Sequence, residues 1–511
     1  MTNQKHERKE LRTAREKLHE YFTYENFTSC QETCITRLLS GRDTVALLPT
    51  GAGKTLCYQI PALCFEGLTL VVTPLVSLMH DQVAQMTAKA KEHGLKKQIP
   101  SAYIDSTQSG TKQILIDSAG GKYKLLYVTP ERLKDPVFLR FTKKADIDFL
   151  AIDEAHCISM WGYDFRAAYL EIIRFIRCLD KRPVIGAFTA TATQSVRDDM
   201  IRLLKLNTGE PVEGGFKREN LTFSLRKAGS GGEKKKKLKE YLSGHREEAG
   251  IIYCSTKEEA ESVHAYLVQE GRHPALYHAG RSSGEREEEH HRFMYETDCR
   301  LMVATNAYGM GINKRDVRFV IHYNMPKDME SYYQEAGRAG RDGKKAECIL
   351  YVNKDPRSGE DYGICRGFLE SFKTGNEFDE ETARYRYDLG RYRLERMAEY
   401  CGMAAGRATS KELQEFIENY FKEPLPEALL LSPGDEKRME KSLEKRLTEI
   451  RALYYNNTKI ANEIRSGAYE IGAEKQIDCG RKASRTGERK ELPLSYKIES
   501  DNGERLSYVD M

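Results

Sequence analysis

Two series of short apolar runs, each alternating with helix-like segments, constrain the fold of this 511-residue chain more than any other feature. Such alternation is typical of parallel sheets flanked by helices. The sequence therefore predicts an α/β fold with two tandem parallel-sheet domains, followed by a helical, charged region beyond about residue 355. The runs expected to form strands are 44–48, 69–74, 125–130, 148–153 and 184–189 in the first series, and 249–254, 274–278, 300–305, 318–323 and 347–352 in the second.

Composition excludes some classes of protein. A 40% hydrophobic share with 31% charged residues is ordinary for a globular chain, and no apolar run approaches the ~20 residues that span a bilayer. The charged N-terminus lacks an apolar segment for export, so we expect a cytoplasmic location, nucleoid-associated if bacterial, and no membrane partner. The net charge of +4 permits a nucleic-acid partner, and the 12 scattered cysteines are expected to be reduced thiols.

A glycine-rich turn follows the first expected strand, although Leu48 stands where the strict phosphate-loop pattern has a glycine. Gly51 and Gly53 can form a tight turn whose N–H groups point at phosphate oxygens. Lys54 would then reach the β- and γ-phosphates, and Thr55 would offer its hydroxyl to Mg²⁺. The alternative is a surface turn with an unrelated lysine. The candidate nucleotide-binding residues of this turn are Thr50, Gly51, Ala52, Gly53, Lys54 and Thr55.

Two local predictions concern the segments beside these runs. A helix that begins near Thr55 is expected to be interrupted by Pro61. Residues 229–237, Gly-Ser-Gly-Gly-Glu-Lys-Lys-Lys-Lys, are expected to form a solvated linker or loop.

Two adjacent carboxylates, Asp153 and Glu154, follow the strand expected at 148–153. Ligands bind at the carboxyl ends of strands in open α/β sheets. In a phosphate-loop ATPase, Asp153 would hold Mg²⁺ and Glu154 would polarise the attacking water. An acidic pair can also simply begin a helix, but together with the glycine-rich turn the pair favours a nucleotide site.

The segments Phe27-Thr-Ser-Cys-Gln31 and Phe149-Leu-Ala-Ile-Asp-Glu-Ala-His156, with the glycine-rich turn, resemble the RecQ family of superfamily 2 DNA helicases over about residues 15–355. The resemblance implies two RecA-like domains and ATP with Mg²⁺ as cofactors. It also implies that Gln31 pairs with the adenine edge beside Tyr24. The family usually has arginine where this chain has Thr28.

Several segments resemble the family's DNA-contacting motifs. Ser77 lies in the stretch 73–82, which with 128–132 resembles motifs that contact the DNA backbone, although both could be ordinary turns. The stretch 157–166 resembles an aromatic-rich loop that couples DNA contact to ATP hydrolysis, with His156 at its ATP end. Aromatic clusters are usually core, but glycine and aspartate interrupt this one, which favours an exposed loop. The residues expected to contact DNA there by base stacking or charge are Trp161, Tyr163, Phe165 and Arg166.

Thr189 and Thr191 lie in a segment that resembles the motif linking hydrolysis to domain movement, although their hydroxyls could instead cap a helix. Residues 304–313 and 331–341 resemble motifs V and VI. Arg341 would be the arginine finger facing ATP, Arg338 its support, and Gln334 would position water or the γ-phosphate. The alternative is a glycine-broken helix with surface arginines.

The region after the second series departs from the family. Residues 416–423 resemble a helix of its zinc-binding module, but no cysteine precedes them at the expected place. Cys401 and Cys479 are the only cysteines after Cys365, and two distant thiols do not form a zinc site. We therefore predict no structural zinc.

Four domains are expected: an N-terminal RecA-like ATP-binding domain at 1–210, a second RecA-like domain at 211–355, a helical region resembling a degenerate zinc-binding module at 356–425, and a tail of unknown fold at 426–511. The resemblance implies an ATP-dependent DNA helicase that moves 3′ to 5′ along single-stranded DNA, in repair or recombination. Its partners would be single-stranded and tailed duplex DNA. An ATP-gated translocase without productive unwinding and an RNA helicase of the same superfamily remain open.

Overall fold

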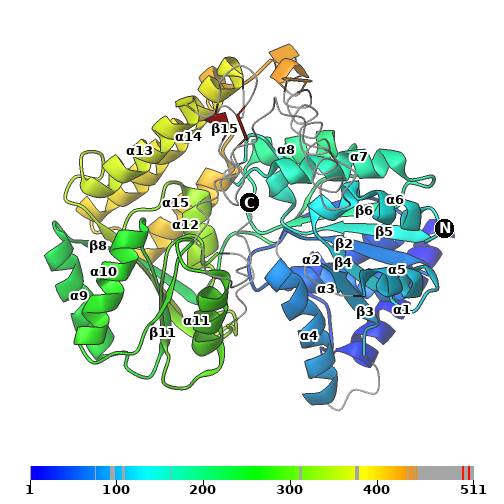
Figure 1. Cartoon of the computed structure of the whole chain (residues 1–511), viewed down its shortest axis with the longest axis horizontal. Coiled ribbons are helices and arrows are strands. Elements are labelled where there is room, and N and C mark those ends of the chain that lie inside the picture. The colour runs from blue at the N-terminus through cyan, green and yellow to red at the C-terminus, as the bar shows by residue number, and fades with distance from the viewer. Residues whose placement is uncertain are drawn as a thin grey trace, which may run out of the picture. The chain divides into compact units, whose positions relative to one another are not determined.

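The computed structural model describes residues 2–22, 24–74, 76–92, 98–105, 110–162, 164–309, 314–374, 379–432, 434–435, 437–439, 441–442, 445, 498–499 and 505–506 (Figure 1). It divides into two compact units, Met1–Leu369 with Asp388–Leu430, and Glu370–Tyr387 with Leu431–Met511. The first unit holds both large sheets.

The first series of apolar runs forms a seven-stranded parallel sheet in the order β3-β4-β2-β5-β6-β1-β7. Every residue of β1, β2 and β4 is buried, as expected for a parallel sheet covered on both faces. The five expected strands are confirmed, whereas β3 and β7 were not expected. The strands are β1 Thr44–Leu47, β2 Leu68–Val72, β3 Ser101–Ile104, β4 Leu125–Val128, β5 Ile147–Ile152, β6 Val184–Thr189 and β7 Val212–Glu213.

Helices cover both faces of this sheet. Leu38, Tyr58 and Met79, from α2, α3 and α4, join Val71 and Phe149 of the strands in one core cluster. Figure 1 shows α7 and α8 above β6 and β2, and α4 on the opposite side. The helices are α1 Thr2–Tyr21, α2 Ser29–Leu39, α3 Lys54–Cys64, α4 Val76–Glu92, α5 Thr111–Ala119, α6 Pro136–Thr142, α7 Leu170–Cys178 and α8 Gln194–Leu203, with 3₁₀ turns η1 Pro130–Lys134, η2 Ala155–Ile158 and η3 Ala167–Tyr169.

Helix α3 continues through Pro61 to Cys64, so the predicted interruption is wrong. Proline removes one intrahelical N–H bond, but the residues from Leu56 to Leu63 are all buried and hold the helix by packing. The Phe65 N–H donates to the Pro61 carbonyl at 2.9 Å and closes the last turn.

The second series forms a six-stranded parallel sheet in the order β10-β11-β9-β12-β13-β8. All five expected strands are confirmed, and β8 was not expected. The strands are β8 Leu221–Lys227, β9 Ala249–Tyr253, β10 Ala275–Tyr277, β11 Leu301–Ala304, β12 Val317–His322 and β13 Ala346–Val352; the helices are α9 Gly231–Ser243, α10 Lys257–Gln269, α11 Ser283–Tyr295, α12 Met329–Ala336 and α13 Glu360–Thr374.

The glycine- and lysine-rich run 229–237 is not a linker, which corrects the prediction. It begins helix α9, because the Ser230 side chain caps the helix by accepting the Glu233 N–H. Lys234 and Leu238 of this helix are buried in the second domain. The run of lysines was therefore misinterpreted as solvated, although one face of the helix packs against the second domain.

Helices follow the second sheet, as predicted: α14 Glu380–Gly402, η4 Met403–Ala405, α15 Ser410–Lys422 and η5 Glu427–Leu429. Aromatic packing joins them to the sheet domain. Phe421 stacks on Phe216 with ring centroids 4.5 Å apart, and Tyr400 lies 5.2 Å from Tyr332. Cys401 is buried, and Cys479 lies outside the described residues, so the zinc prediction stays a prediction.

The second compact unit is described only in part. Within it Arg438 pairs with Glu381 at 2.7 Å, and β14 Ile498–Glu499 pairs antiparallel with β15 Arg505–Leu506. The predicted domain boundaries stay predictions; β7 extends the first sheet a few residues past 210. Within the described part of the chain, no helix combines the length and apolar character needed to cross a bilayer.

Candidate active site

The glycine-rich turn joins the end of β1 to the start of α3. Gly51 and Gly53 have φ of +88° and +80°, a backbone region that favours glycine. A Cβ at Gly53 would lie 2.5 Å from Nε2 of Gln31, so a side chain here would displace the Gln31 amide. The turn therefore directs the N-terminus of a buried helix toward one point, which suits an anion.

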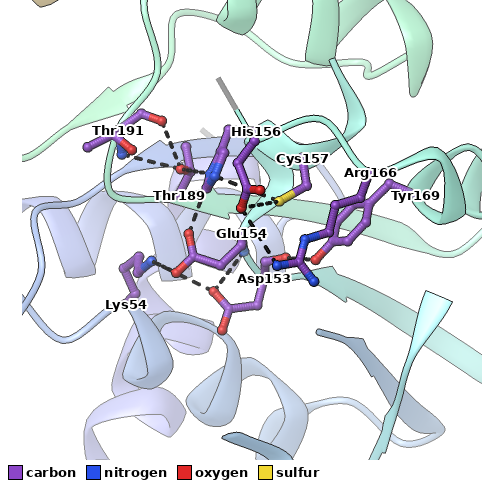
Figure 2. Close-up of polar contacts among 10 residues, drawn as sticks. Lys54, Asp153, Glu154, His156, Cys157, Arg166, Tyr169, Thr189 and Thr191 are labelled. Atoms are coloured by element: carbon purple, nitrogen blue, oxygen red, sulfur yellow. Dashed lines mark hydrogen bonds and ion pairs between the residues drawn. The ribbon is translucent and has the colours of Figure 1, made fainter. Parts of the chain in front are cut away.

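The acidic pair follows β5, and Lys54 of the turn reaches it (Figure 2). The Lys54 Nζ lies 3.2 Å from Oε1 of Glu154 and 3.8 Å from Oδ1 of Asp153. The three side chains are 10% to 15% exposed, so their charges interact in a largely water-free place. Residues 100 positions apart in the sequence thus meet.

Burial and charge separate the two carboxyl groups. Burial raises the pKa of Asp153 to about 6, because the loss of solvation outweighs the attraction of Lys54, and Glu154 adds a smaller repulsion. For Glu154 the effect of burial is outweighed by Lys54 and His156, and its pKa is lowered. Burial also opposes charge on Lys54, yet Glu154 and Asp153 raise its pKa. The site thus holds a charged lysine beside one firmly ionised carboxylate.

The backbone at Glu154 is in the left-handed region, with φ of +48°. Such a conformation costs a non-glycine residue about 1 to 3 kcal/mol and persists only where its surroundings fix it. Two contacts fix it here: the Glu154 N–H donates to Oδ1 of Asp153 at 3.0 Å, and the Tyr169 hydroxyl donates to the Asp153 carbonyl at 2.8 Å. The turn aims both carboxylates at Lys54.

A polar chain leads from Glu154 toward β6. Nδ1 of His156 lies 3.4 Å from Oε2 of Glu154 and 2.7 Å from the Thr189 hydroxyl. The Thr189 hydroxyl also accepts the Thr191 N–H at 3.3 Å. The structure therefore brings the three predicted coupling residues, His156, Thr189 and Thr191, into one buried network (Figure 2).

The aromatic-rich loop continues this network. Cys157 donates to Oδ2 of Asp164 at 3.8 Å, and Arg166 pairs with the same oxygen at 3.8 Å. Phe165 and Arg166 are partly exposed, but Trp161 is only 4% exposed, so the expectation of an exposed loop is wrong for Trp161. Its indole packs inside because the turn folds back on η2. Tyr163 and the Ser77 side chain lie outside what the structure describes.

Gln31 lies beside the turn and joins it to helix α2. Its amide nitrogen donates to the Ala52 carbonyl at 3.0 Å, and its amide oxygen accepts the Thr28 N–H at 3.0 Å. Thr28 is the N-cap of α2, which gives the residue that replaces the family's arginine a structural role. Tyr24 is 47% exposed and thus offers an open aromatic face near the start of α2.

The helix that carries Gln334 leads to the two arginines, and its end packs on the glycine-rich turn. A Cβ at Gly51 would lie 3.8 Å from Cα of Arg341. Burial, then neighbouring Arg338, lowers the pKa of Arg341 to about 9, so the guanidinium is charged at neutral pH. The structure therefore places Arg341 beside the glycine-rich turn that carries Lys54.

Arg218 was missed by sequence reasoning. Its guanidinium donates to the Thr50 carbonyl at 2.6 Å and to the Gly340 carbonyl at 2.9 Å. One side chain thus ties the glycine-rich turn to the arginine segment across 168 and 122 residues of sequence. Nothing local marks such a residue, since both acceptors are backbone atoms.

Thr55 and Asp153 offer a hydroxyl and a carboxylate, which are the oxygen ligands that Mg²⁺ prefers. Asp153 is 7% exposed and its carboxylate is poorly neutralised, as its raised pKa shows. A divalent cation would supply the missing positive charge. The residues present therefore fit a magnesium ion bound with a nucleoside triphosphate.

Comparison with known proteins gives two family matches: the DEAD/DEAH box helicase family over residues 28–199 and the helicase conserved C-terminal domain over residues 233–343. The ATP-dependent DNA helicase RecQ of Bacillus subtilis (strain 168) is 42% identical over 421 residues, 82% of this chain and 66% of that protein. RecQ of Pasteurella multocida (strain Pm70) is 41% identical over 344 residues, 66% of this chain and 52% of that protein. The chain thus spans between half and two thirds of these relatives.

Solved structures show the same fold. Mss116p, bound to ssRNA and AMP-PNP, superposes with a TM-score of 0.56 at 15% identity, covering 79% of this chain and 94% of that one. The DUF1998 helicase MrfA, bound to DNA, gives a TM-score of 0.56 at 19% identity, covering 71% and 53%. The paired parallel sheets are therefore those of RecA-like helicases, as predicted.

Proposed function

Because the chain belongs to the RecQ family of DNA helicases, we propose that it is an ATP-dependent DNA helicase that hydrolyses ATP between its two RecA-like domains. One observation carries the proposal: Lys54 and the acidic pair of the first domain lie against the arginine segment of the second. The contacts are the 3.2 Å Lys54–Glu154 pair and the close approach of Gly51 to Arg341. Phosphoryl transfer needs this combination of positioning and positive charge.

Nucleotide binding would give the Lys54 ammonium new partners. The ammonium now lies between two carboxylates and would move to the β- and γ-phosphate oxygens, which the glycine-rich turn receives with its N–H groups. Mg²⁺, held by Thr55 and Asp153, would neutralise phosphate charge. Glu154, freed from Lys54 and oriented by His156, would then accept a proton from the attacking water.

The second domain would complete the site. Arg341 would stabilise charge on the transferring phosphoryl group, while Arg338 and Gln334 would support it. Because Lys54 and the arginines belong to different sheets, ATP binding would close the two domains and hydrolysis would release them. Repeated on single-stranded DNA, this cycle gives translocation, for which we propose the 3′-to-5′ direction.

The DNA contacts stay part of the proposal. Phe165 and Arg166 are partly exposed beside the buried network that reaches Glu154, so base stacking there would be sensed at the ATP site. Single-stranded and tailed duplex DNA are the proposed partners. A cytoplasmic location and a role in repair or recombination stay predictions.

Two other functions have support. The first follows from the prediction of no structural zinc: a motor that lacks the zinc module would translocate without unwinding. An RNA helicase is the second candidate, because a relative from Acanthamoeba polyphaga mimivirus, 38% identical over 358 residues, is described as a putative ATP-dependent RNA helicase. Comparing ATPase stimulation by DNA with that by RNA of matched sequence distinguishes the RNA helicase from the two DNA-dependent enzymes.

The deciding experiment is strand release from a 3′-tailed DNA duplex with ATP, beside a 5′-tailed duplex and a reaction without ATP. Release from the 3′-tailed substrate alone is expected. Hydrolysis stimulated by DNA without release would support the translocase instead. Stimulation by RNA but not by DNA would overturn the DNA helicase proposal.

A further inference from the structure

The aromatic-rich loop is held in a closed turn. The Trp161 N–H donates to the Ser159 hydroxyl at 3.3 Å, and the Gly162 N–H donates to the Ser159 carbonyl at 3.0 Å. A Cβ at Gly162 would lie only 3.0 Å from the His156 carbonyl, so the turn is tightly packed. In this state the Trp161 side chain is buried and offers no face to a base.

Arg393 of helix α14 contacts this turn from a distant part of the chain. Its guanidinium donates through Nη2 to the carbonyl oxygen of Trp161 and through Nε to Oε1 of Glu330 at 3.0 Å. The Arg393 side chain is 9% exposed and that of Glu330 is 2% exposed. A buried, charged fork thus joins a loop of the first domain to the second domain, 232 residues away in sequence from Trp161.

Glu330 gives this contact a route to the arginines. It is the second residue of α12, the helix that carries Gln334 and precedes Arg338 and Arg341. Tyr420 of α15 interacts with the same carboxylate. The helical region after the second sheet therefore touches both the loop and the helix that supplies the arginines.

We propose that Arg393 is a positioning residue that holds the aromatic-rich loop closed and passes its release to the arginine helix. While Arg393 bonds the Trp161 carbonyl, Trp161 stays buried. When the loop opens onto single-stranded DNA, that bond is lost, and the Arg393–Glu330 pair is left to reorient α12. The transmission half of this inference rests on the proposed function, whereas the holding half concerns the free protein alone.

Trp161 is the only tryptophan of the chain, so its fluorescence reports the loop directly. In the whole protein without DNA or ATP, wild type should show a blue-shifted emission that acrylamide quenches poorly. Arg393→Met should shift the emission to the red and raise the quenching constant at least about twofold. Arg391→Met is the matched control, because that side chain is 64% exposed and two residues away; it should behave as wild type.

Hydrolysis gives the second readout. In Arg393→Met, ATP hydrolysis without DNA should rise, and its stimulation by a single-stranded oligonucleotide should fall about fivefold or more, a typical size for coupling between two sites. Arg393→Lys keeps the charge but lacks the planar guanidinium fork that holds both acceptors, so it should be intermediate in both readouts. Circular dichroism of each variant checks that the fold is kept.

Each outcome decides one half of the proposal. Unchanged Trp161 quenching in folded Arg393→Met would overturn the holding role, whatever hydrolysis does. Exposed Trp161 with normal DNA stimulation would overturn the transmission. If Arg393→Met does not fold, the Arg393→Lys variant decides both halves by the same criteria. If wild type itself shows no DNA stimulation, the proposed function fails, yet the fluorescence comparison still tests the holding role.

Discussion

The two sheet domains each bury a lysine beside carboxylate oxygens, but the two clusters differ. In the second domain, Nζ of Lys234 lies 3.0 Å from both oxygens of Asp361, which also accept from Asn324 at 2.8 Å and from the Met325 N–H at 3.1 Å. In the first, Lys54 faces two carboxylates at unequal distances, and burial raises the pKa of Asp153.

The difference separates a structural ion pair from the proposed nucleotide site. The Asp361 carboxylate has donors on both oxygens, so its charge is compensated and it fastens α9 to α13. The Asp153 carboxylate is buried with too little positive charge, and Glu154 beside it has a strained backbone. Such costs are retained where a ligand later supplies the missing charge.

The largest expected effect comes from Lys54→Ala. ATP hydrolysis should fall about 1,000-fold or more, because the phosphates lose their positive partner, while single-stranded DNA binding stays largely intact. Phosphate release and filter binding measure the two. Lys181→Ala, at a lysine that is 68% exposed, is the control. Near-normal hydrolysis by Lys54→Ala would remove this site from the mechanism.

Asp361→Asn should act on stability instead. Loss of the carboxylate leaves the Lys234 charge buried and uncompensated, which costs about 3 to 5 kcal/mol of unfolding free energy. Urea denaturation measures this change. Hydrolysis per folded molecule should stay near wild type at low temperature; a selective loss of hydrolysis would erase the distinction between the two clusters.

Asp153→Asn should instead increase stability and abolish hydrolysis at neutral pH. Removing a poorly compensated buried charge should raise the unfolding free energy by about 1 to 2 kcal/mol while hydrolysis is lost, since the proposed magnesium ion would lose a ligand. This gain in unfolding free energy should increase as the pH rises. The folded pKa of Asp153, about 6, is above the unfolded value, so the wild-type carboxyl is unfavourable only when ionised in the folded state.

The stability gain of Asp153→Asn should therefore be full above about pH 6. It should disappear as pH falls toward 4, where the Asp153 carboxyl becomes protonated in both the folded and the unfolded wild-type protein. Urea curves at pH 5 and pH 7.5 measure it. A variant that is less stable than wild type at pH 7.5 would show that Asp153 is compensated as fully as Asp361.

The smallest expected effect is that of Thr189→Val. It removes the 2.7 Å contact with His156 and should cost about 1 kcal/mol of stability, because His156 keeps its contact with Glu154. DNA stimulation of hydrolysis should fall more than basal hydrolysis. Equal losses of both would make Thr189 a structural partner, like Glu335 beside His322 in the second domain.

Sequence patterns predicted the fold where burial is uniform. All ten apolar runs became strands, because strands of a covered parallel sheet are apolar on both faces. Strand β8 was not predicted because its last two residues, Arg226 and Lys227, are charged. Helix α9 was hidden for the same reason, since its buried Lys234 looks like surface until Asp361 is placed beside it.

The site was predictable where chemistry is local. Lys54, Asp153 and Glu154 come together because parallel strands end at one edge of a sheet. Arg218 and Arg393 could not be found, because both donate to backbone carbonyls that only the folded chain brings near. The burial of Trp161 was missed because its turn folds back on η2, and only the folded chain shows that packing.

The strand order of the first sheet also sets an order of events on the ribosome. Strand β5, which delivers the acidic pair, finds its neighbour β2 already synthesised. Strand β1, which carries the glycine-rich turn, pairs only with β6 and β7 and must wait for residues 184–213 to emerge. The glycine-rich turn is therefore completed after the acidic pair, and a nascent chain cut before β6 leaves β1 without a neighbour, exposed to chaperones and proteases.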